Sequence, residues 1–151
     1  MPKLIRTNAS HQDFQTLVVL LDHDLQIRDG AEHSFFAQFN RIDSLQHVVV
    51  AYVENEAIGC GAFKPYQGTA VEIKRMFVRP EYRGQRIAQH VLTELEAWAS
   101  ELGATSFVLE TGLKQPEAIR LYQRCGYERI PNYGQYAGVE NSVCMQKETA
   151  Q

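Results

Sequence analysis

The sequence predicts an α/β protein of the α+β type, with a mixed, mostly antiparallel central sheet of six to seven strands flanked by about four helices. Runs of β-branched and aromatic residues between positions 47 and 78 alternate with short turns, which is typical of an antiparallel meander. From residue 71 to residue 110 the pattern changes to strand, helix and strand, an order that implies a parallel crossover. Both kinds of pairing are therefore expected in one sheet, with helices on both faces.

The N-terminal segment is expected to form an edge strand at residues 4–6 and then a helix capped by Ser10. The apolar residues of this helix recur at helical spacing, at Phe14, Leu17, Val18 and Leu21. The Asp29-Gly30 pair predicts a turn after the helix. A second short helix is expected over residues 31–39, where the phenylalanines form a stripe that is more typical of a core than of a ligand site.

The antiparallel meander is expected to contain strands at residues 47–53, 57–64 and 69–78. Short polar turns are expected to join them, at residues 54–56 and 66–68. Gly59 and Gly61 fall inside the second of these strands. A dinucleotide-binding loop would need a third glycine and a following helix, and neither is present here. We therefore interpret both glycines as strand residues.

An amphipathic helix is expected from Ile87 to Leu102, because its apolar residues recur at helical spacing and a glycine follows. A short strand is expected at residues 106–110. The next segment predicts a short helix that begins at Pro116 and stops at Gly126. The remaining strands are expected on either side of a loop, at residues 127–129 and 142–147.

A basic turn that contains a glycine lies between the meander and the amphipathic helix, and it reads Arg83-Gly84-Gln85-Arg86-Ile87-Ala88. Its glycine and the free N–H groups of the first helical turn can surround an anion, and its arginines add positive charge. The turn lacks the Gly-Lys-Ser/Thr ending of a nucleoside triphosphate loop. The pattern therefore predicts an anion-binding turn of another kind.

The length of 151 residues fits one domain, residues 1–151, with a core of its own. No apolar run approaches the roughly 20 residues that a membrane helix needs, and no signal-peptide pattern is visible, so a cytoplasmic location is expected. The net charge of −3 argues against nucleic-acid or membrane partners. The cysteines and histidines lack metal-ligand spacing, so we expect reduced thiols and no metal site.

Two motifs occur in a fixed order: Arg83-x-x-Arg86-x-Ala88 at the basic turn, and a later block from Gln115 to Tyr127. The first resembles the pyrophosphate loop of the GNAT superfamily of acyl-CoA-dependent N-acetyltransferases, Gln/Arg-x-x-Gly-x-Gly/Ala, with Arg86 in place of the middle glycine. The second is similar to that family's Asn-x-x-Ala-x-x-Leu-Tyr-x-x-x-Gly-Phe/Tyr motif, with Gln115 where asparagine is usual. The order and spacing of both motifs make the resemblance specific.

The resemblance extends over residues 48–147 and implies a GNAT-like domain whose central parallel strands splay apart. It implies acetyl-CoA as cosubstrate, held in that gap without a metal. Backbone N–H groups at the splay polarise the thioester carbonyl in this family, and Phe77 and Val78 match that position. The cofactor-binding residues that the resemblance implies are Phe77, Val78, Arg83, Gly84, Gln85, Arg86, Ile87, Ala88, Gln115 and Tyr122.

Acetyl transfer from a thioester to an amine requires a base, because an amine with a pKa of about 10 is mostly protonated at neutral pH. Glu72 matches the position of a glutamate base in the family and is the first candidate, with Glu110 in reserve. The structural alternative is that Glu72 simply pairs with Lys74 or Arg75. Tyr122 matches the family's tyrosine, which donates a proton or a hydrogen bond to the departing thiolate.

The resemblance places the acceptor between the first two helices and the loop before the last strand, and the candidates there are Arg28, Asp29, His33, Tyr133 and Tyr136. The leading hypothesis is transfer of the acetyl group to a primary amine of a small molecule, by direct attack in a ternary complex. A protein amine stays open. The alternative from another class is a noncatalytic acyl-CoA-binding sensor or partner module. A homodimer is compatible with the sequence, which does not specify an oligomeric state.

Overall fold

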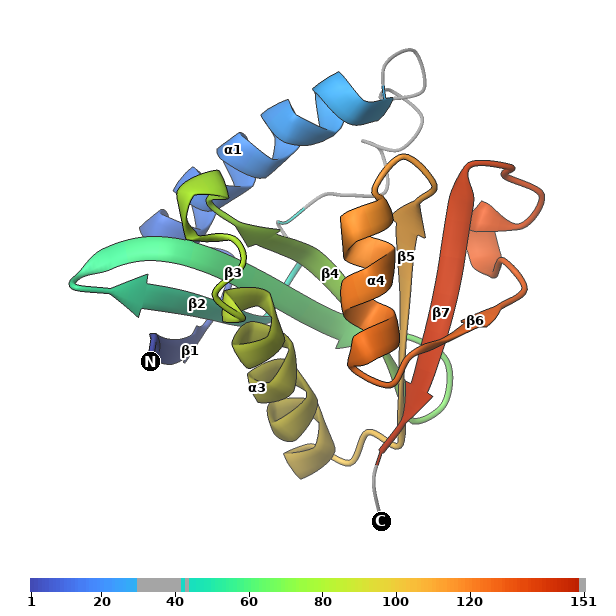
Figure 1. Ribbon diagram of the computed structural model, residues 1–151. Coiled ribbons are helices and arrows are strands. Elements are labelled where there is room, and N and C mark those ends of the chain that lie inside the picture. The colour runs from blue at the N-terminus through green and yellow to red at the C-terminus, as the bar shows by residue number, and fades with distance from the viewer. Residues whose placement is uncertain (30–41, 43, 150–151) are drawn as a thin grey trace.

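The computed structural model describes residues 1–29, 42 and 44–149, and its centre is one seven-stranded sheet (Figure 1). The strands are β1 (Lys3–Thr7), β2 (His47–Val53), β3 (Glu56–Pro65), β4 (Ala70–Val78), β5 (Ser106–Gly112), β6 (Glu128–Ile130) and β7 (Ser142–Glu148). The α-helices of the described residues are α1 (Gln12–Asp29), α3 (Ile87–Glu101) and α4 (Pro116–Arg124). Short 3-10 turns lie at η2 (Pro80–Tyr82) and η3 (Gly134–Tyr136).

The strands follow the order β1-β2-β3-β4-β5-β7-β6. The pair β4–β5 is parallel, and the other neighbouring pairs are antiparallel. This arrangement confirms the predicted α/β class, the mixed and mostly antiparallel sheet, and the parallel crossover through α3. The predicted helix over residues 31–39 lies outside the described residues.

The sheet is the middle layer of the fold, with α1 on one face and α3 and α4 on the other (Figure 1). Each face buries its own apolar cluster. Val48 and Val50 of β2 pack with the apolar face of α1, whereas Val49 and Ala51 pack with α3. Because side chains alternate between the two faces of a strand, a strand covered on both sides is apolar at nearly every position. That is why β2 reads as a continuous apolar run.

The start of α1 differs from the prediction. Ser10 does not cap the helix; its hydroxyl donates to Asn8 Oδ1 at 2.6 Å. His11 takes the capping position, and its Nδ1 accepts a hydrogen bond from the backbone N–H of Asp13 at 3.2 Å. The helix then continues to Asp29, so residues 22–29 are helical. A ring nitrogen replaces the expected hydroxyl as the acceptor for an otherwise unpaired N–H group.

Gly59 and Gly61 lie in β3, as predicted. A Cβ atom at Gly61 would lie 2.4 Å from Sδ of Met76 and 2.8 Å from Cδ1 of Leu95. Glycine at this position therefore lets α3 pack directly on the sheet. The close approach of the helix places its N-terminus beside the end of β4.

β4 carries a bulge and then separates from β5. Cys60 pairs with Phe77, but Ala62 pairs with Lys74, so one residue of β3 lies opposite two of β4 at this point. Arg75 at the bulge has φ +59°, in the left-handed region. The pairing of β4 with β5 runs only from Ala70 to Glu72, although both strands continue beyond it. The splay that the resemblance implied is thus present.

Candidate active site

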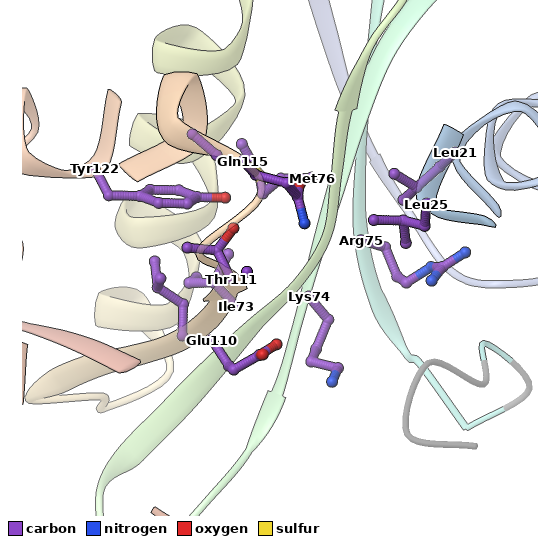
Figure 2. A pocket seen from close by; sticks show the side chains of 13 residues that line it. Leu21, Leu25, Ile73, Lys74, Arg75, Met76, Glu110, Thr111, Gln115 and Tyr122 are labelled. Carbon is purple, nitrogen blue, oxygen red and sulfur yellow. The ribbon is translucent and has the colours of Figure 1, made fainter. Parts of the chain in front are cut away.

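A pocket of about 110 Å³ opens where β4 and β5 diverge (Figure 2). The strands contribute residues 73–76 and 109–112. Leu21 and Leu25 of α1 line it from one face of the sheet, and α4 together with Gln115 lines it from the other. A pocket that passes between two strands can therefore hold two reactants that arrive from opposite faces.

Tyr122 and Gln115 are the predicted cofactor residues that reach this pocket. Tyr122 is buried on α4, and its hydroxyl points into the pocket, toward Thr111 and Gln115 (Figure 2). Burial raises the pKa of the Tyr122 phenol above its ordinary value, so the hydroxyl keeps its proton at neutral pH. The side chain is suited to donate a hydrogen bond rather than to act as a base.

Glu110 is the carboxylate that lines the pocket. It is half-buried on β5, and the hydroxyl of Ser142 on β7 donates to its Oε2 at 2.8 Å. Lys74 of β4 lies on the same side of the splay (Figure 2). Burial is the main cause that lowers the pKa of Lys74, while the carboxylates of Glu72 and Glu110 act in the opposite direction.

Glu72 is placed differently from Glu110. Its side chain is buried, with 2% of its surface exposed, and it is not among the residues that line the pocket. The hydroxyl of Tyr133 donates to Glu72 Oε2 at 2.7 Å, and Nζ of Lys64 lies 3.8 Å from Oε1. Neither Lys74 nor Arg75 forms the ion pair with Glu72 that the structural alternative expected.

Tyr133 and Tyr136 come from the loop around η3, which lies on the face of the sheet opposite α4 (Figure 1). Their rings meet edge to face, with centroids 5.8 Å apart. The Tyr136 hydroxyl accepts a hydrogen bond from Nζ of Lys74 at 3.4 Å. Burial raises the pKa of both phenols. The two predicted acceptor residues therefore meet the side chains of Glu72 and Lys74 on β4.

Arg28, a predicted acceptor residue of α1, does not line the pocket. Arg28 forms ion pairs with Asp24, at 3.3 Å, and with Glu117 of α4. It therefore links α1 to α4 across the splayed strands. Asp29 is the last residue of α1, and His33 lies outside the described residues.

The basic turn between β4 and α3 has an open N-terminal helix end. Arg86 precedes α3 with φ +64°, so it adopts the left-handed conformation that a glycine usually supplies at this position. No side chain caps α3, so N–H groups of its first turn are available to an anion. Gly84 has φ +82° and open space around it. Arg86 thus gives the turn the left-handed backbone conformation expected of the glycine that it replaces, and the helix end stays uncapped by the described side chains.

Arg83 holds the turn against the end of β4. Its Nε donates to the backbone oxygen of Val78 at 2.9 Å, and its guanidinium lies 5.7 Å from the centre of the Phe77 ring. Phe77 and Val78 are themselves buried at the end of the strand. The predicted cofactor residues 83–88 are therefore joined directly to the strand that borders the pocket, and Gln85 is exposed within them.

Metal-ligand clusters and membrane-spanning helices were sought in the described part of the chain. No group of three or more histidine, cysteine, aspartate or glutamate side chains is close enough to hold a metal ion there. Within the same residues, no helix is both long and apolar enough to cross a membrane. The cysteines are free thiols, and burial raises the pKa of Cys125, which lies within the second motif.

Sequence reasoning did not assign Lys74, Arg75 or Thr111 to the site. All three line the pocket. The available signal was the Lys74-Arg75 pair inside a strand that is otherwise largely apolar, because charged residues are rarely buried without a partner. From the sequence, these two residues were expected only as ion-pair partners of Glu72.

The fold and the pocket define an α/β protein with a two-sided binding site between splayed parallel strands. The chain belongs to the acetyltransferase (GNAT) family, whose model matches residues 14–127. That match includes α3, the basic turn and both motifs, so the family and the resemblance seen in the sequence agree.

Named relatives agree with this assignment. An IAA acetyltransferase from Azospirillum brasilense is 35% identical over 100 residues, which are 66% of this chain and 65% of that protein; the chain thus spans slightly less than two thirds of that relative. The crystal structure of a candidate acyl-CoA N-acyltransferase from Klebsiella pneumoniae has a TM-score of 0.82 and 27% identity, covering 98% of this chain and 97% of the other. The PaiA N-acetyltransferase of Thermoplasma acidophilum, solved with coenzyme A, has a TM-score of 0.73 and 16% identity over 99% of both chains.

Proposed function

We propose that the protein is an N-acetyltransferase that moves the acetyl group of acetyl-CoA to a primary amine of a small molecule, by direct attack in a ternary complex. The observation that carries this proposal is the pocket between β4 and β5. It brings the motif tyrosine Tyr122 from one face of the sheet and the carboxylate Glu110 from the other into one cavity. Family membership supports acetyl-CoA as the acyl donor.

The basic turn would hold the pyrophosphate of the donor. The free N–H groups at the start of α3, preceded by Arg83 and Arg86, supply both oriented donors and positive charge. Gly84 leaves the approach open, since nothing lies within 4 Å of a Cβ atom placed there. Bound at this turn, the donor would direct its thioester toward the pocket beside β4.

Of the two predicted backbone donors, Phe77 and Val78, Val78 is the better placed to donate a hydrogen bond to the thioester oxygen. The N–H of Arg79 donates to the oxygen of Ile58 at 2.8 Å, so Arg79 is hydrogen-bonded toward β3. Because the N–H groups of successive strand residues point to alternate sides, that of Val78 points away from β3, to the side from which β5 has separated. An N–H fixed in this direction can stabilise the negative charge that develops on the thioester oxygen, an effect that can contribute several kcal/mol.

The geometry supports Glu110 as the general base. Glu110 lines the pocket, and its Oε2 is oriented by Ser142. Glu72 instead accepts a hydrogen bond from Tyr133 and would position that side of the acceptor site. In this assignment Glu110 takes a proton from the protonated amine, directly or through a water molecule, and leaves the neutral nitrogen free to attack.

Tyr122 would act at the departing sulfur. As the amine nitrogen forms a bond to the carbonyl carbon, the carbon–sulfur bond breaks and the sulfur leaves with the electron pair. The protonated hydroxyl of Tyr122 can stabilise this thiolate by a hydrogen bond. Full proton transfer is not required, because a free thiol has a lower pKa, about 8.5, than a phenol, about 10.

The test is a calorimetric titration with acetyl-CoA, followed by mass spectrometry of a panel of small amines incubated with the protein and acetyl-CoA. We expect micromolar binding that is weakened in a variant with both Arg83→Ala and Arg86→Ala. Arg129→Ala is the matched control, because Arg129 is an exposed arginine on the edge strand β6. Its substitution should leave binding unchanged.

The outcomes separate the competing functions. Binding of acetyl-CoA that depends on the arginines of the basic turn, together with acetylation of an amine, supports the N-acetyltransferase. Binding that depends on these arginines, without acetyl transfer to any amine, supports the noncatalytic acyl-CoA-binding module. Absence of acetyl-CoA binding in the wild type overturns both.

A further inference from the structure

Arg75 is a buried arginine on the acceptor side of the pocket. It lies at the bulge of β4 with a left-handed backbone conformation, and its side chain reaches Asp22 of α1. Figure 2 shows Arg75 on the side of Leu21 and Leu25, across β4 from Tyr122. Only 1% of its side-chain surface is exposed, and the residue lines the pocket.

The guanidinium of Arg75 is only partly satisfied. Its Nη2 donates to Oδ1 of Asp22 at 2.5 Å. Its Nε and Nη1 are buried and have no hydrogen-bond partner within residues 1–29, 42 and 44–149. A buried N–H group without an acceptor is unfavourable, and more so when it belongs to a charged group. Three donor hydrogens therefore lack an acceptor in the described part of the chain, because Nε carries one and Nη1 carries two.

The charges around the pocket are arranged in a way that suits a ligand with both signs. Lys74 and Arg75 are adjacent basic residues on β4; Asp22, which is half-exposed on α1, pairs with Arg75, and the carboxylates of Glu72 and Glu110 act on Lys74. The carboxylate of Glu110 comes from the opposite strand, β5. An amine that approached Glu110 would thus lie in a pocket that also holds the basic side chains of β4, and a negative group elsewhere in the molecule would complement them.

We propose that the acceptor is a small amine that also bears a carboxylate, of the amino-acid type, and that Arg75 binds this carboxylate. This inference rests on the proposed function, and it adds the substrate class of the same site. A carboxylate oxygen is a strong acceptor for a guanidinium N–H, and the pairing would satisfy buried donors that have no partner among the described residues. Polyamines and other purely cationic amines are disfavoured, because Lys74 and Arg75 would repel them.

The test uses pairs of compounds that differ only in the carboxylate: free L-amino acids and the corresponding amino-acid amides. Acetyl transfer is followed by mass spectrometry, and binding in the presence of coenzyme A by calorimetry. The variants are Arg75→Met, Arg75→Lys and, as the exposed control, Arg129→Met. Arg75→Met leaves Asp22 without its partner, but Asp22 is 52% exposed and can be hydrated, so we expect this variant to fold.

We expect the wild type to prefer amino acids over their amides, and Arg75→Met to raise the KM for the amino acids by roughly 10- to 100-fold without raising the KM for the amides. Arg75→Lys should restore part of the loss, and Arg129→Met should behave like the wild type. In every variant the affinity for acetyl-CoA should stay the same.

Failure of this inference can be distinguished from failure of the proposed function. Equal use of amino acids, amides and polyamines, or an equal loss for all of them in Arg75→Met, overturns the role of Arg75 but leaves the acetyltransferase intact. Arg75-dependent binding of amino acids without any transfer keeps the ligand class and overturns the enzyme. If neither amino acids nor amides bind in the presence of coenzyme A, the inference is wrong.

Discussion

The two sides of the splayed strands are built in different ways. The proposed cofactor half consists of residues 83–88 with the end of β4 and of Gln115 and Tyr122 at α4. Each of these parts is a short contiguous segment. The acceptor half consists of Lys74, Arg75 and Glu110 with Glu72 and Tyr133, and it is assembled from β4, β5 and the loop before β7. Tyr133 and Glu72, for example, are 61 residues apart in the chain.

This difference separates a general part of the site from a selective part. The cofactor half offers backbone N–H groups and exposed arginines, which suit any ligand with the same phosphates. The acceptor half offers buried charges whose partners come from distant segments. Changes in the cofactor half should therefore alter donor binding or the shared chemistry, whereas changes in the acceptor half should alter activity through the acceptor.

The largest effect is expected for Glu110→Gln. Loss of a general base lowers kcat by about 10²- to 10⁴-fold, and acetyl-CoA affinity should be unchanged because the residue lies in the acceptor half. The matched change, Glu72→Gln, keeps a side chain that can accept from Tyr133 and should have a smaller effect. Steady-state kinetics of both variants decide between the two carboxylates. A larger loss for Glu72→Gln would return the role of base to Glu72.

Tyr122→Phe should lower kcat by about 10- to 100-fold, which corresponds to the loss of one hydrogen bond to a developing charge. The ring stays in place, so the affinity for acetyl-CoA and the thermal stability should change little. Single-turnover kinetics with a saturating amine measure the effect. Unchanged kcat in this variant would remove the chemical role of the cofactor half and leave it a binding role only.

Gly61→Val tests the packing that supports the cofactor half. The new side chain would overlap Met76 and Leu95, and overpacking of this kind destabilises a protein by about 1–3 kcal/mol. Chemical denaturation measures the loss. Gly68→Val is a useful comparison, since Gly68 has a positive φ but nothing within 4 Å of its Cβ position. Gly61 itself has no positive φ, so a loss there cannot come from backbone strain; an unchanged unfolding free energy in Gly61→Val would show that the packing of α3 does not require this glycine.

Arg86 combines charge with an unfavourable backbone conformation, and two substitutions separate these properties. Both Arg86→Gly and Arg86→Ala remove the charge and should weaken acetyl-CoA binding to a similar extent. Arg86→Gly should be more stable than Arg86→Ala by about 1 kcal/mol, because alanine keeps the cost of a positive φ. Calorimetry and thermal unfolding measure the two properties independently. Equal stability of the two variants would contradict this explanation.

The smallest effect concerns pH and the docking of α1 behind the acceptor half. The Tyr52 hydroxyl donates to Oδ2 of Asp13, and burial, together with this bond, raises the pKa of Tyr52 to about 12. The folded state therefore holds the phenol proton more tightly than the unfolded state, whose pKa is about 10. The resulting stability is fully present below pH 10 and is lost as the pH rises from 10 to 12.

Tyr52→Phe should flatten the decline of the unfolding free energy between pH 10 and pH 12, which urea titrations at several pH values would detect. A variant whose stability falls as steeply as that of the wild type over this range would show that other groups cause the decline.

The fold was predictable to a large extent because its elements are specified locally. The strands expected at residues 47–53, 57–64 and 69–78 occur as His47–Val53, Glu56–Pro65 and Ala70–Val78. Their β-branched residues and bounding turns are enough to identify them. The motifs at residues 83–88 and at α4 indicated the cofactor half for the same reason, since each lies within one short segment.

The acceptor half was only partly predictable. Tyr133 and Tyr136 were expected near the acceptor, but their contacts with Glu72 and Lys74 were not. Arg28 was expected near the acceptor, but its ion pair with Glu117 on another helix was not. A side chain's spacing along the chain does not reveal which distant segment it faces, and these contacts depend on how the loop before β7 and α1 pack on the sheet.

By itself the sequence determined the mixed sheet, the basic turn before α3 and the presence of a motif tyrosine, because periodicity, turn chemistry and helix ends act over a few residues. The tertiary structure alone decided that β4 bulges at Arg75, that β5 separates beyond Glu72, and that Glu110 rather than Glu72 lines the resulting pocket. These features depend on strand register and helix packing, in which each position is set by contacts with distant parts of the chain.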